Sequence, residues 1–222
     1  KYFVLPHFQE FIKSKEGEVS LRTGKKLSKK TIDKYNGTLN VFKEFQKSIN
    51  TSIRWQELDK DFHKTFLGYL TNDLMYNKTN AGKHLSILNQ VCSSGRSKGI
   101  KINPYAEHSK FSLPRDRTYD PYLNIKEIKL ISNLDLSNNA RLDNARDWLL
   151  IGVWTGLRIS DILELDSLKI QSGRFQILTE KITDRVIIPI HRDVQRILNK
   201  RNGDFPKKIS DQKFNDYIKE IA

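Results

Sequence analysis

The segment WTGLRISDILELDSLKI, residues 154–170, contains a break in an apolar run and an arginine at the start of the next one. Before the break, the spacing of apolar residues predicts a helix over Ala140–Val153. Glycine at position 156 is typical of a helix end. The apolar residues that follow predict a second helix; they are Ile159, Ile162, Leu163 and Leu165. Arg158 opens this helix with Asp161 three residues on, so its guanidinium either forms a surface ion pair or binds an anion.

The composition excludes several classes of protein. The chain has 222 residues, of which 37% are hydrophobic, and no apolar run approaches the roughly 18 residues of a membrane helix. No signal peptide is recognisable, and because the chain begins at Lys1 we expect a fragment. Cys92 is the only cysteine, which rules out an intrachain disulfide and fits a reducing cytoplasm. The five histidines lack metal-ligand spacing, so neither a metal nor another cofactor is expected.

The net charge of +13 is unevenly distributed along the chain. Residues 1–112 carry 20 Lys/Arg against 10 Asp/Glu, whereas residues 113–222 carry 19 against 16. A basic chain without a membrane segment most often binds nucleic acid. The alternative is a basic surface that serves only solubility.

The first half of the chain has the periodicity of helices. Ser28 is a candidate N-cap for the first of them, and Asn103-Pro104 ends the helical pattern. Three apolar stripes are predicted to be buried: Ile32, Tyr35, Leu39, Phe42 and Phe45; Phe62, Phe66, Leu70 and Leu74; and Leu85, Leu88, Val91 and Cys92. Residues 113–123, LPRDRTYDPYL, contain two prolines and four charges without periodicity. They predict a linker between a domain at 1–112 and a second domain at 124–222.

The second half of the chain mixes helices and strands. Asn124 and Glu127 form a capping-box pattern for a helix through Leu134. The runs Arg174–Leu178 and Arg185–Ile190 predict a β-hairpin, with Pro189 placing the second strand at a sheet edge. A last helix is predicted from the stripe of Phe214, Tyr217, Ile218 and Ile221.

Two groups of basic and polar residues are candidates for contacts with DNA. Lys25, Lys26, Lys29 and Lys30 lie at the start of the first predicted helix, where positive charge is unfavourable for the helix dipole. They are better explained as a phosphate cradle, although a solvated lysine-rich loop is the alternative. The second group lies on or just beyond the third predicted helix, which could enter a major groove; it comprises Asn80, Lys83, His84, Arg96 and Lys98.

This order of motifs resembles the tyrosine recombinase (phage-type integrase) family along nearly the whole chain. The resemblance rests on four segments: TGLRISDILEL (155–165), TEKITDRVIIPI (179–190), SKKTIDKY (28–35) and GIKINPY (99–105). It implies a mainly α fold with a small β-hairpin or sheet. A helical core-binding (SAM-like) domain would be joined to a truncated α+β catalytic domain.

The resemblance also implies a chemistry for the second domain. In this family a tyrosine attacks a DNA phosphodiester to give a 3′-phosphotyrosyl intermediate, and no metal is used. Arg158 would neutralise the charge on the phosphate oxygens, because a guanidinium binds phosphate through two parallel hydrogen bonds. Lys181 would protonate the departing 5′-oxygen, and Asp161 would orient Arg158. Alternatively, Lys181 is a loop lysine that serves solubility and Asp161 is purely structural; Ile182 also stands where the family commonly has threonine.

The family's H-x-x-R box and nucleophilic tyrosine are missing from the sequence. His191-Arg192 has the wrong spacing and is interpreted as surface, and Tyr217 lies on an apolar stripe and is interpreted as core. We therefore expect a fragment that binds double-stranded DNA without cleaving it. The complete protein is expected to be a cytoplasmic recombinase of a mobile element, encoded by a bacterium or phage and acting as a synaptic homotetramer. A non-catalytic protein that competes for recombination sites is the alternative, whereas an RNA-binding protein has little support.

Overall fold

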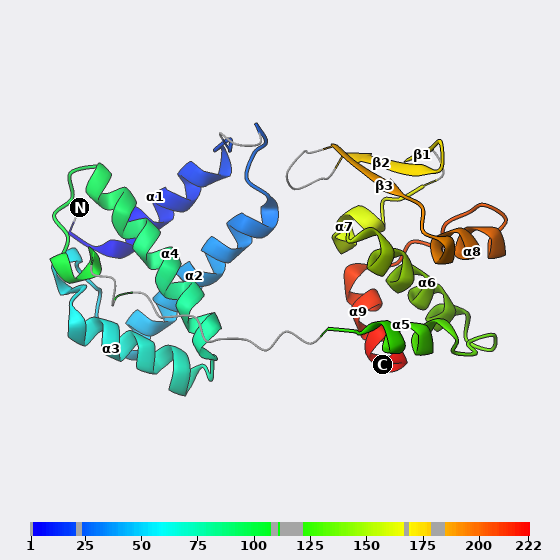
Figure 1. The fold of residues 1–222 in the computed structure, drawn as a ribbon. Helices are drawn as coiled ribbons and strands as arrows, with labels where there is room; N and C mark the ends of the chain where they lie inside the picture. Colours follow the sequence, from blue (N-terminus) through cyan, green and yellow to red (C-terminus); the bar gives the residue numbers. More distant parts are fainter. Residues whose placement is uncertain (1, 21–23, 108–110, 112–121, 167–168, 179–184) are drawn as a thin grey trace. The chain divides into compact units, whose positions relative to one another are not determined.

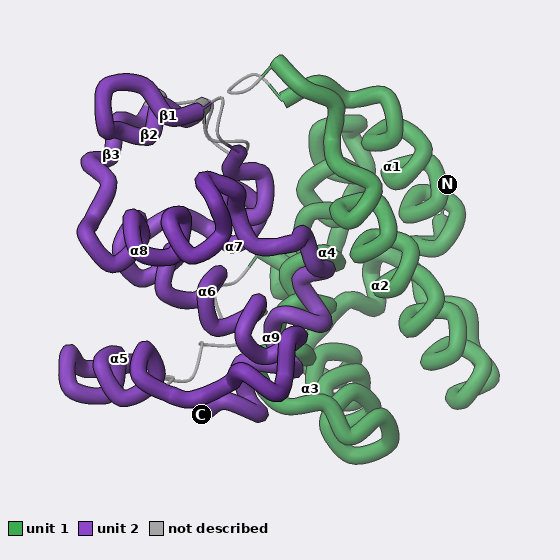
Figure 2. Tube along the Cα trace, turned by 90° about the vertical axis from the view of Figure 1, so that its right-hand side faces the viewer, with its two compact units in different colours: residues 1–119 green, residues 120–222 purple. Residues whose placement is uncertain are grey.

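The computed structural model describes residues 2–20, 24–107, 111, 122–166, 169–178 and 185–222. The chain divides into two compact units, residues 1–119 and 120–222, coloured separately in Figure 2. This division falls within the linker predicted at 113–123, of which residues 113–121 lie outside the described part. Each unit has its own hydrophobic core.

Unit 1 is helical in its described residues (Figure 1). Its helices are α1 (Val4–Glu16), α2 (Lys29–Ser48), α3 (Lys60–Gly68) and α4 (Lys78–Ser97). Shorter turns are the 3-10 segments Trp55–Glu57 and Pro104–Glu107 and the π-helical segment Tyr69–Asp73. The three predicted helical stripes are confirmed, but α1 was not predicted. The sequence does contain the apolar pattern of this helix, because Val4, Phe8, Phe11 and Ile12 recur at helical spacing and are buried.

Side-chain caps begin the helices of unit 1, and phenylalanines pack their inner faces together. Ser28 is confirmed as the N-cap of α2, since its hydroxyl accepts a hydrogen bond from the Thr31 N–H at 3.3 Å. Asp59 and Asn77 cap α3 and α4 in the same way. Rings from three helices meet in the core: Phe8, Phe42, Phe45, Phe62 and Phe66. The polar faces of α2 and α4 are exposed to solvent.

Unit 2 combines helices with a small antiparallel sheet. Its helices are α5 (Ile125–Ser132), α6 (Ala140–Thr155), α7 (Ile159–Ile162), α8 (Arg192–Lys200) and α9 (Asp211–Ile221). Its strands are β1 (Ile170–Gln171), β2 (Arg174–Leu178) and β3 (Arg185–Pro189). The capping box of Asn124 and Glu127 at α5 is confirmed, as are the helix α6 and the pair of strands β2 and β3. The sequence did not predict β1 or α8, and α7 is shorter than expected.

The sheet of the described residues has the order β1-β2-β3. Ser172 and Gly173 both have positive φ in the turn between β1 and β2, a geometry whose twist suits a tight hairpin. Phe175 and Ile177 on β2 are buried in the core. Pro189 pairs with Arg174 at the end of β3, an edge strand, as its missing N–H predicts.

Helix α6 runs through the middle of unit 2 and carries buried charge as well as apolar residues. Asp147 is only 1% exposed and accepts hydrogen bonds from the Arg201 guanidinium (Nη2 at 2.7 Å, Nε at 3.0 Å). Lys200 reaches the same carboxylate at 3.2 Å, and Arg146 also pairs with Asp143. This network fastens α8 to α6.

The prediction that Tyr217 belongs to the core is wrong. Helix α9, which packs against α6, has no buried residue, and Tyr217 is half-buried. The guanidinium of Arg141 lies 4.8 Å from the ring centroid of Tyr217 and forms paired hydrogen bonds of 2.8 and 2.7 Å with Glu220. The apolar stripe is real, but α9 lies at the surface, where the arginine covers the ring.

Candidate DNA-binding surface and phosphate-binding residues

Gly156 ends α6 in a conformation that other residues adopt at a cost. Its φ is +65°, and its N–H donates to the Gly152 carbonyl at 2.9 Å. A residue in the left-handed region just past a helix is most often glycine, because it has no Cβ to clash. The hydroxyl of Thr155 donates back to the Ile151 carbonyl at 2.8 Å. The Thr155-Gly156 pair therefore turns the chain sharply before Arg158.

Arg158 follows this turn as the N-cap residue of α7, with an extended backbone and an exposed side chain. Its carbonyl accepts hydrogen bonds from the N–H groups of Asp161 and Ile162, each at 2.9 Å. The backbone of Arg158 is thus held by the helix that it begins. Its guanidinium lies on the surface of unit 2, where a phosphate could reach it.

Close packing fixes α7 on α6. A Cβ added at Gly152 would lie 2.9 Å from Cδ1 of Ile162, a distance that real Cβ contacts almost never show. Ile162 is buried, as are Leu163 and Leu165 just after it. Glycine at position 152 lets α7 approach closely, so the segment that carries Arg158 is positioned by the core.

Two of the three residues predicted for phosphate chemistry, Arg158 and Asp161, differ in burial. Asp161 is 5% exposed, whereas Arg158 one turn earlier is exposed. Lys181 lies outside the described residues, between Leu178 at the end of β2 and Arg185 at the start of β3. The proposed roles of all three remain predictions.

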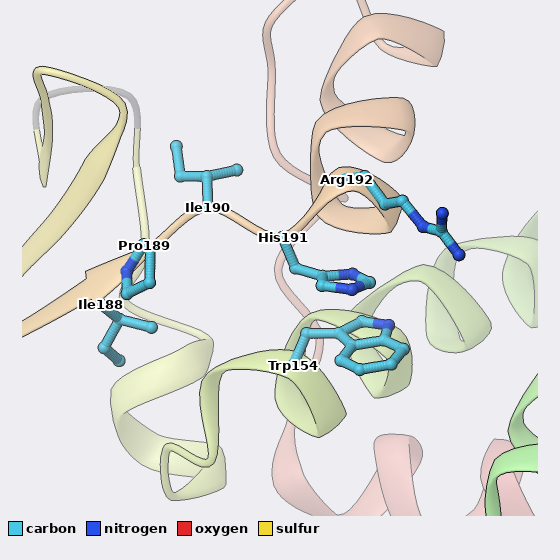
Figure 3. Close-up of a pocket in the computed structure, with 6 residues that line it drawn as sticks. All are labelled: Trp154, Ile188, Pro189, Ile190, His191 and Arg192. Atoms are coloured by element: carbon cyan, nitrogen blue, oxygen red, sulfur yellow. The ribbon is translucent and has the colours of Figure 1, made fainter.

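Trp154 and His191 form a site that sequence reasoning missed. Their rings stack with centroids 3.7 Å apart and planes inclined by 13° (Figure 3). They line an open hollow of about 550 Å³ whose remaining residues are Ile188, Pro189, Ile190 and Arg192. Nδ1 of His191 accepts a hydrogen bond from the Asp193 N–H at 3.2 Å, so His191 caps α8, and Arg192 has a side chain that is 76% exposed. Trp154 comes four residues before Arg158, and no periodicity could have paired it with a histidine so distant in sequence.

The four lysines near the start of α2 are all exposed. Lys25 and Lys26 lie in a turn that folds back on the preceding chain, where Val19 and Lys26 form an antiparallel bridge. Lys29 and Lys30 are the first two residues of α2, whose first turn contains no acidic residue. Two of the four lysines therefore lie in the first turn of α2, where the helix N-terminus favours bound anions, and the other two lie in the turn that precedes it.

The second group of predicted residues does not form one surface. Lys83 is exposed and Asn80 is half-buried near the start of α4, whereas Arg96 and Lys98 lie at its other end. Between Lys83 and Lys98 the helix rises by about 22 Å. Nε of Arg96 pairs with Glu107 at 3.2 Å, and Lys98 lies 3.9 Å from Glu10.

His84 has an internal role in unit 1. Its Nδ1 is hydrogen-bonded to the Thr38 hydroxyl at 2.9 Å, and its ring stacks on Tyr76 with centroids 5.3 Å apart. Burial lowers the pKa of His84, and nearby Lys83 lowers it further. His84 therefore joins α4 to α2, and its neutral form is favoured over a phosphate-binding cation.

The described residues contain neither a metal-binding cluster nor a membrane-spanning helix. No group of three or more His, Cys, Asp or Glu side chains is placed to hold a metal ion. None of the described helices is long and apolar enough to cross a membrane.

Most of unit 1 matches a known protein family in sequence. Residues 4–112 match the family of the phage integrase SAM-like domain. No curated protein sequence matches the chain.

Solved structures extend the likeness to both units. A lambda integrase tetramer bound to a Holliday junction matches with a TM-score of 0.72 and 16% identity, over 98% of this chain and 64% of that one. A lambda integrase dimer bound to a core site gives 0.71 and 14%, over 97% and 61%. The Tn1549 transposon integrase in complex with circular intermediate DNA gives 0.62 and 12%, over 90% and 64%.

At such identities the likeness is one of fold, and the chain spans less than two thirds of these integrases. The mainly helical fold with its small sheet is the one that the sequence predicted. Residues 4–112 therefore match the phage integrase SAM-like domain in sequence, and the chain has the fold of the lambda and Tn1549 integrases.

Proposed function

We propose that this chain is the DNA-binding part of a site-specific recombinase that inserts or excises a mobile element, together with the first portion of its catalytic domain. The observation that carries the proposal is the exposed Arg158, held on the Thr155-Gly156 turn at the start of α7. An exposed arginine on a rigid segment suits binding of a phosphodiester. The integrases of similar fold were solved on DNA, which supports the choice of ligand.

In the proposed reaction of the complete protein, a tyrosine oxygen forms a bond to the DNA phosphorus as the bond from phosphorus to the 5′-oxygen breaks. Arg158 neutralises the charge that develops on the non-bridging oxygens, and Lys181 gives a proton to the departing 5′-oxygen. Losing one preorganised donor to such a charge typically lowers a rate by about 10²–10³. Asp161, a buried residue in the first turn of α7, is proposed to support the position of Arg158.

The sequence contains no H-x-x-R segment. Tyr217 is half-buried under Arg141, a poor setting for a nucleophile. We therefore propose that this chain by itself binds duplex DNA and leaves it uncut. Assembly into a homotetramer on DNA is likewise proposed for the complete protein.

Binding to DNA is tested first, with the lysines at the start of α2. Anisotropy of a labelled duplex is measured against salt for the unaltered chain and for Lys25→Ala/Lys26→Ala/Lys29→Ala/Lys30→Ala. Each lost phosphate contact is expected to lower the slope of log K against log salt by about 0.9. A control with the same change of charge alters four exposed lysines elsewhere in unit 1: Lys13, Lys60, Lys64 and Lys101. Equal slopes for the two variants would contradict the assignment of the α2 lysines, and no salt-dependent binding by the unaltered chain would refute the proposed function.

The catalytic proposal is tested in the complete protein with Arg158→Ala and Arg158→Lys. Both variants are expected to bind DNA and to lose strand cleavage, with lysine restoring little because it lacks the planar fork of donors. Cleavage at the unaltered rate by Arg158→Ala would favour the alternative, a non-catalytic protein of the same fold that competes for recombination sites.

A further inference from the structure

Three glycines inside α-helices differ in what surrounds them. At Gly95 an added Cβ would lie 3.1 Å from Ile102 and 3.3 Å from Trp55, and at Gly152 it would lie 2.9 Å from Ile162. These two residues are glycine because neighbouring side chains pack against the bare backbone. At Gly37, in the middle of α2, an added Cβ would meet nothing within 4 Å in the described part of the chain.

Gly37 also has no backbone reason to be glycine. It lies inside a regular helix and is absent from the glycines of positive φ. Glycine in a helix interior is less favourable than alanine by about 0.5–1 kcal/mol. Gly37 therefore destabilises α2 slightly, and no close packing within the described part of unit 1 compensates for this loss.

Two exposed lysines lie on the same face of α2 as Gly37, toward the start of the helix. Residues three, four and seven positions away share its face of the helix: Lys30, Asp33, Lys34, Asn40 and Glu44 are exposed, and Val41 is half-buried. Lys30 belongs to the proposed phosphate cradle and lies about 10 Å away along the helix axis. A strand of DNA bound by that cradle could continue over Gly37 beside Lys34.

We propose that the outer face of α2 around Gly37 is where the sugar-phosphate backbone of duplex DNA approaches the protein most closely, with glycine retained to leave room. This inference rests on the proposed function. Without a Cβ the helix backbone comes into direct contact with a ligand, a recognised use of glycine. Asp33 opposes the attraction, and Glu44 further along is paired with Lys47 at 2.7 Å.

The proposal predicts opposite effects on stability and on binding. Gly37→Ala is expected to raise the Tm of the chain by about 2–4 °C, because alanine favours the helix and has room. The same variant is expected to weaken binding of a labelled mixed-sequence duplex by about tenfold. Asp33→Asn, which removes the nearest negative charge, is expected to tighten binding severalfold.

Gly68→Ala is the matched control. Gly68 ends α3, and its added Cβ would meet only Asn72 Nδ2 at an ordinary 3.9 Å, so this variant should be stabilised with its affinity for DNA unchanged. A fall in the Tm of Gly37→Ala would overturn the premise that the fold does not need this glycine. Undiminished binding by a stabilised Gly37→Ala would overturn the close approach. Absence of binding by the unaltered chain would instead refute the proposed function.

Discussion

Trp154 and His191 stack face to face with ring centroids 3.7 Å apart, joining the last turn of α6 to the junction of β3 and α8. The contact connects the segment that leads to Arg158 with the strand that follows the predicted position of Lys181. The same histidine caps α8 through Nδ1. One side chain thus contributes to three elements of unit 2.

Replacing His191 should destabilise unit 2 through two losses that different variants can separate, the cap of α8 and the stack on Trp154. His191→Ala removes the helix cap and the stack, worth about 0.5–2 and 0.5–1.5 kcal/mol in other proteins. His191→Asn keeps an oxygen that can cap α8 and removes only the ring, so an intermediate loss is expected. Urea unfolding followed by tryptophan fluorescence measures both variants, and stabilities equal to that of the unaltered chain would show that the stack contributes nothing.

Gly152→Ala should destabilise the packing of α7 on α6. Its Cβ would lie 2.9 Å from Cδ1 of Ile162, and overpacking of this kind costs about 1–3 kcal/mol, against a gain in helix propensity of up to about 1 kcal/mol. Ile162→Val removes the opposing methyl group. In a double-mutant cycle by chemical unfolding, the pair should therefore be less destabilised than the sum of the single changes. Strict additivity would mean that the two residues do not compete for space.

The buried carboxylate of Asp147 should be indispensable to unit 2. Asp147→Ala leaves Arg201 and Lys200 with only the more exposed Asp143 as a partner, and removing one member of a buried ion pair typically costs about 3–5 kcal/mol. Asp143→Ala in the same network is the control. Its side chain is 21% exposed, so a smaller loss is expected. Comparable free energies of unfolding for the two variants would contradict the importance given to burial.

Unit 1 should lose stability in mild acid. Burial lowers the pKa of His7 and of His63, with Lys98 adding to the effect at His7, and Nε2 of each ring is buried without a hydrogen-bond partner in the described structure. Because the folded-state pKa lies below the unfolded value of about 6.5, the unfolded chain binds more protons. Stability is therefore complete above about pH 6.5 and falls as the pH drops below it.

Urea unfolding of unit 1 between about pH 8 and pH 5 measures this dependence. His7→Gln/His63→Gln is expected to be less stable at neutral pH but to show a flatter dependence on pH. A dependence as steep as that of the unaltered chain would assign the effect to other groups, of which His84 is the first to examine because its pKa is lowered as well.

The sequence by itself determined the features that are encoded over a few neighbouring residues. The helical stripes of Phe42 and Phe66, the cap at Ser28 and the capping box at Asn124 each depend on spacing within one or two turns. The break at Gly156 and the strand end at Pro189 follow from the backbone chemistry of single residues in the same way. Local periodicity therefore sufficed for the order of helices and hairpin and for the placement of Arg158 at a helix start, whereas the fold class followed from the resemblance to a family.

Only the tertiary structure decided which side chains meet. The sequence placed His84 with the DNA-binding residues, but packing of α4 on α2 turns its ring toward Thr38. The sequence also placed Tyr217 in the core, but α9 lies at the surface of unit 2. The spacing of apolar residues shows which face of a helix or strand is buried. It does not show which other element packs against that face, because that element comes from elsewhere in the chain. For the same reason the buried Asp147, the stack of His191 on Trp154 and the unfilled space beside Gly37 became visible only in three dimensions.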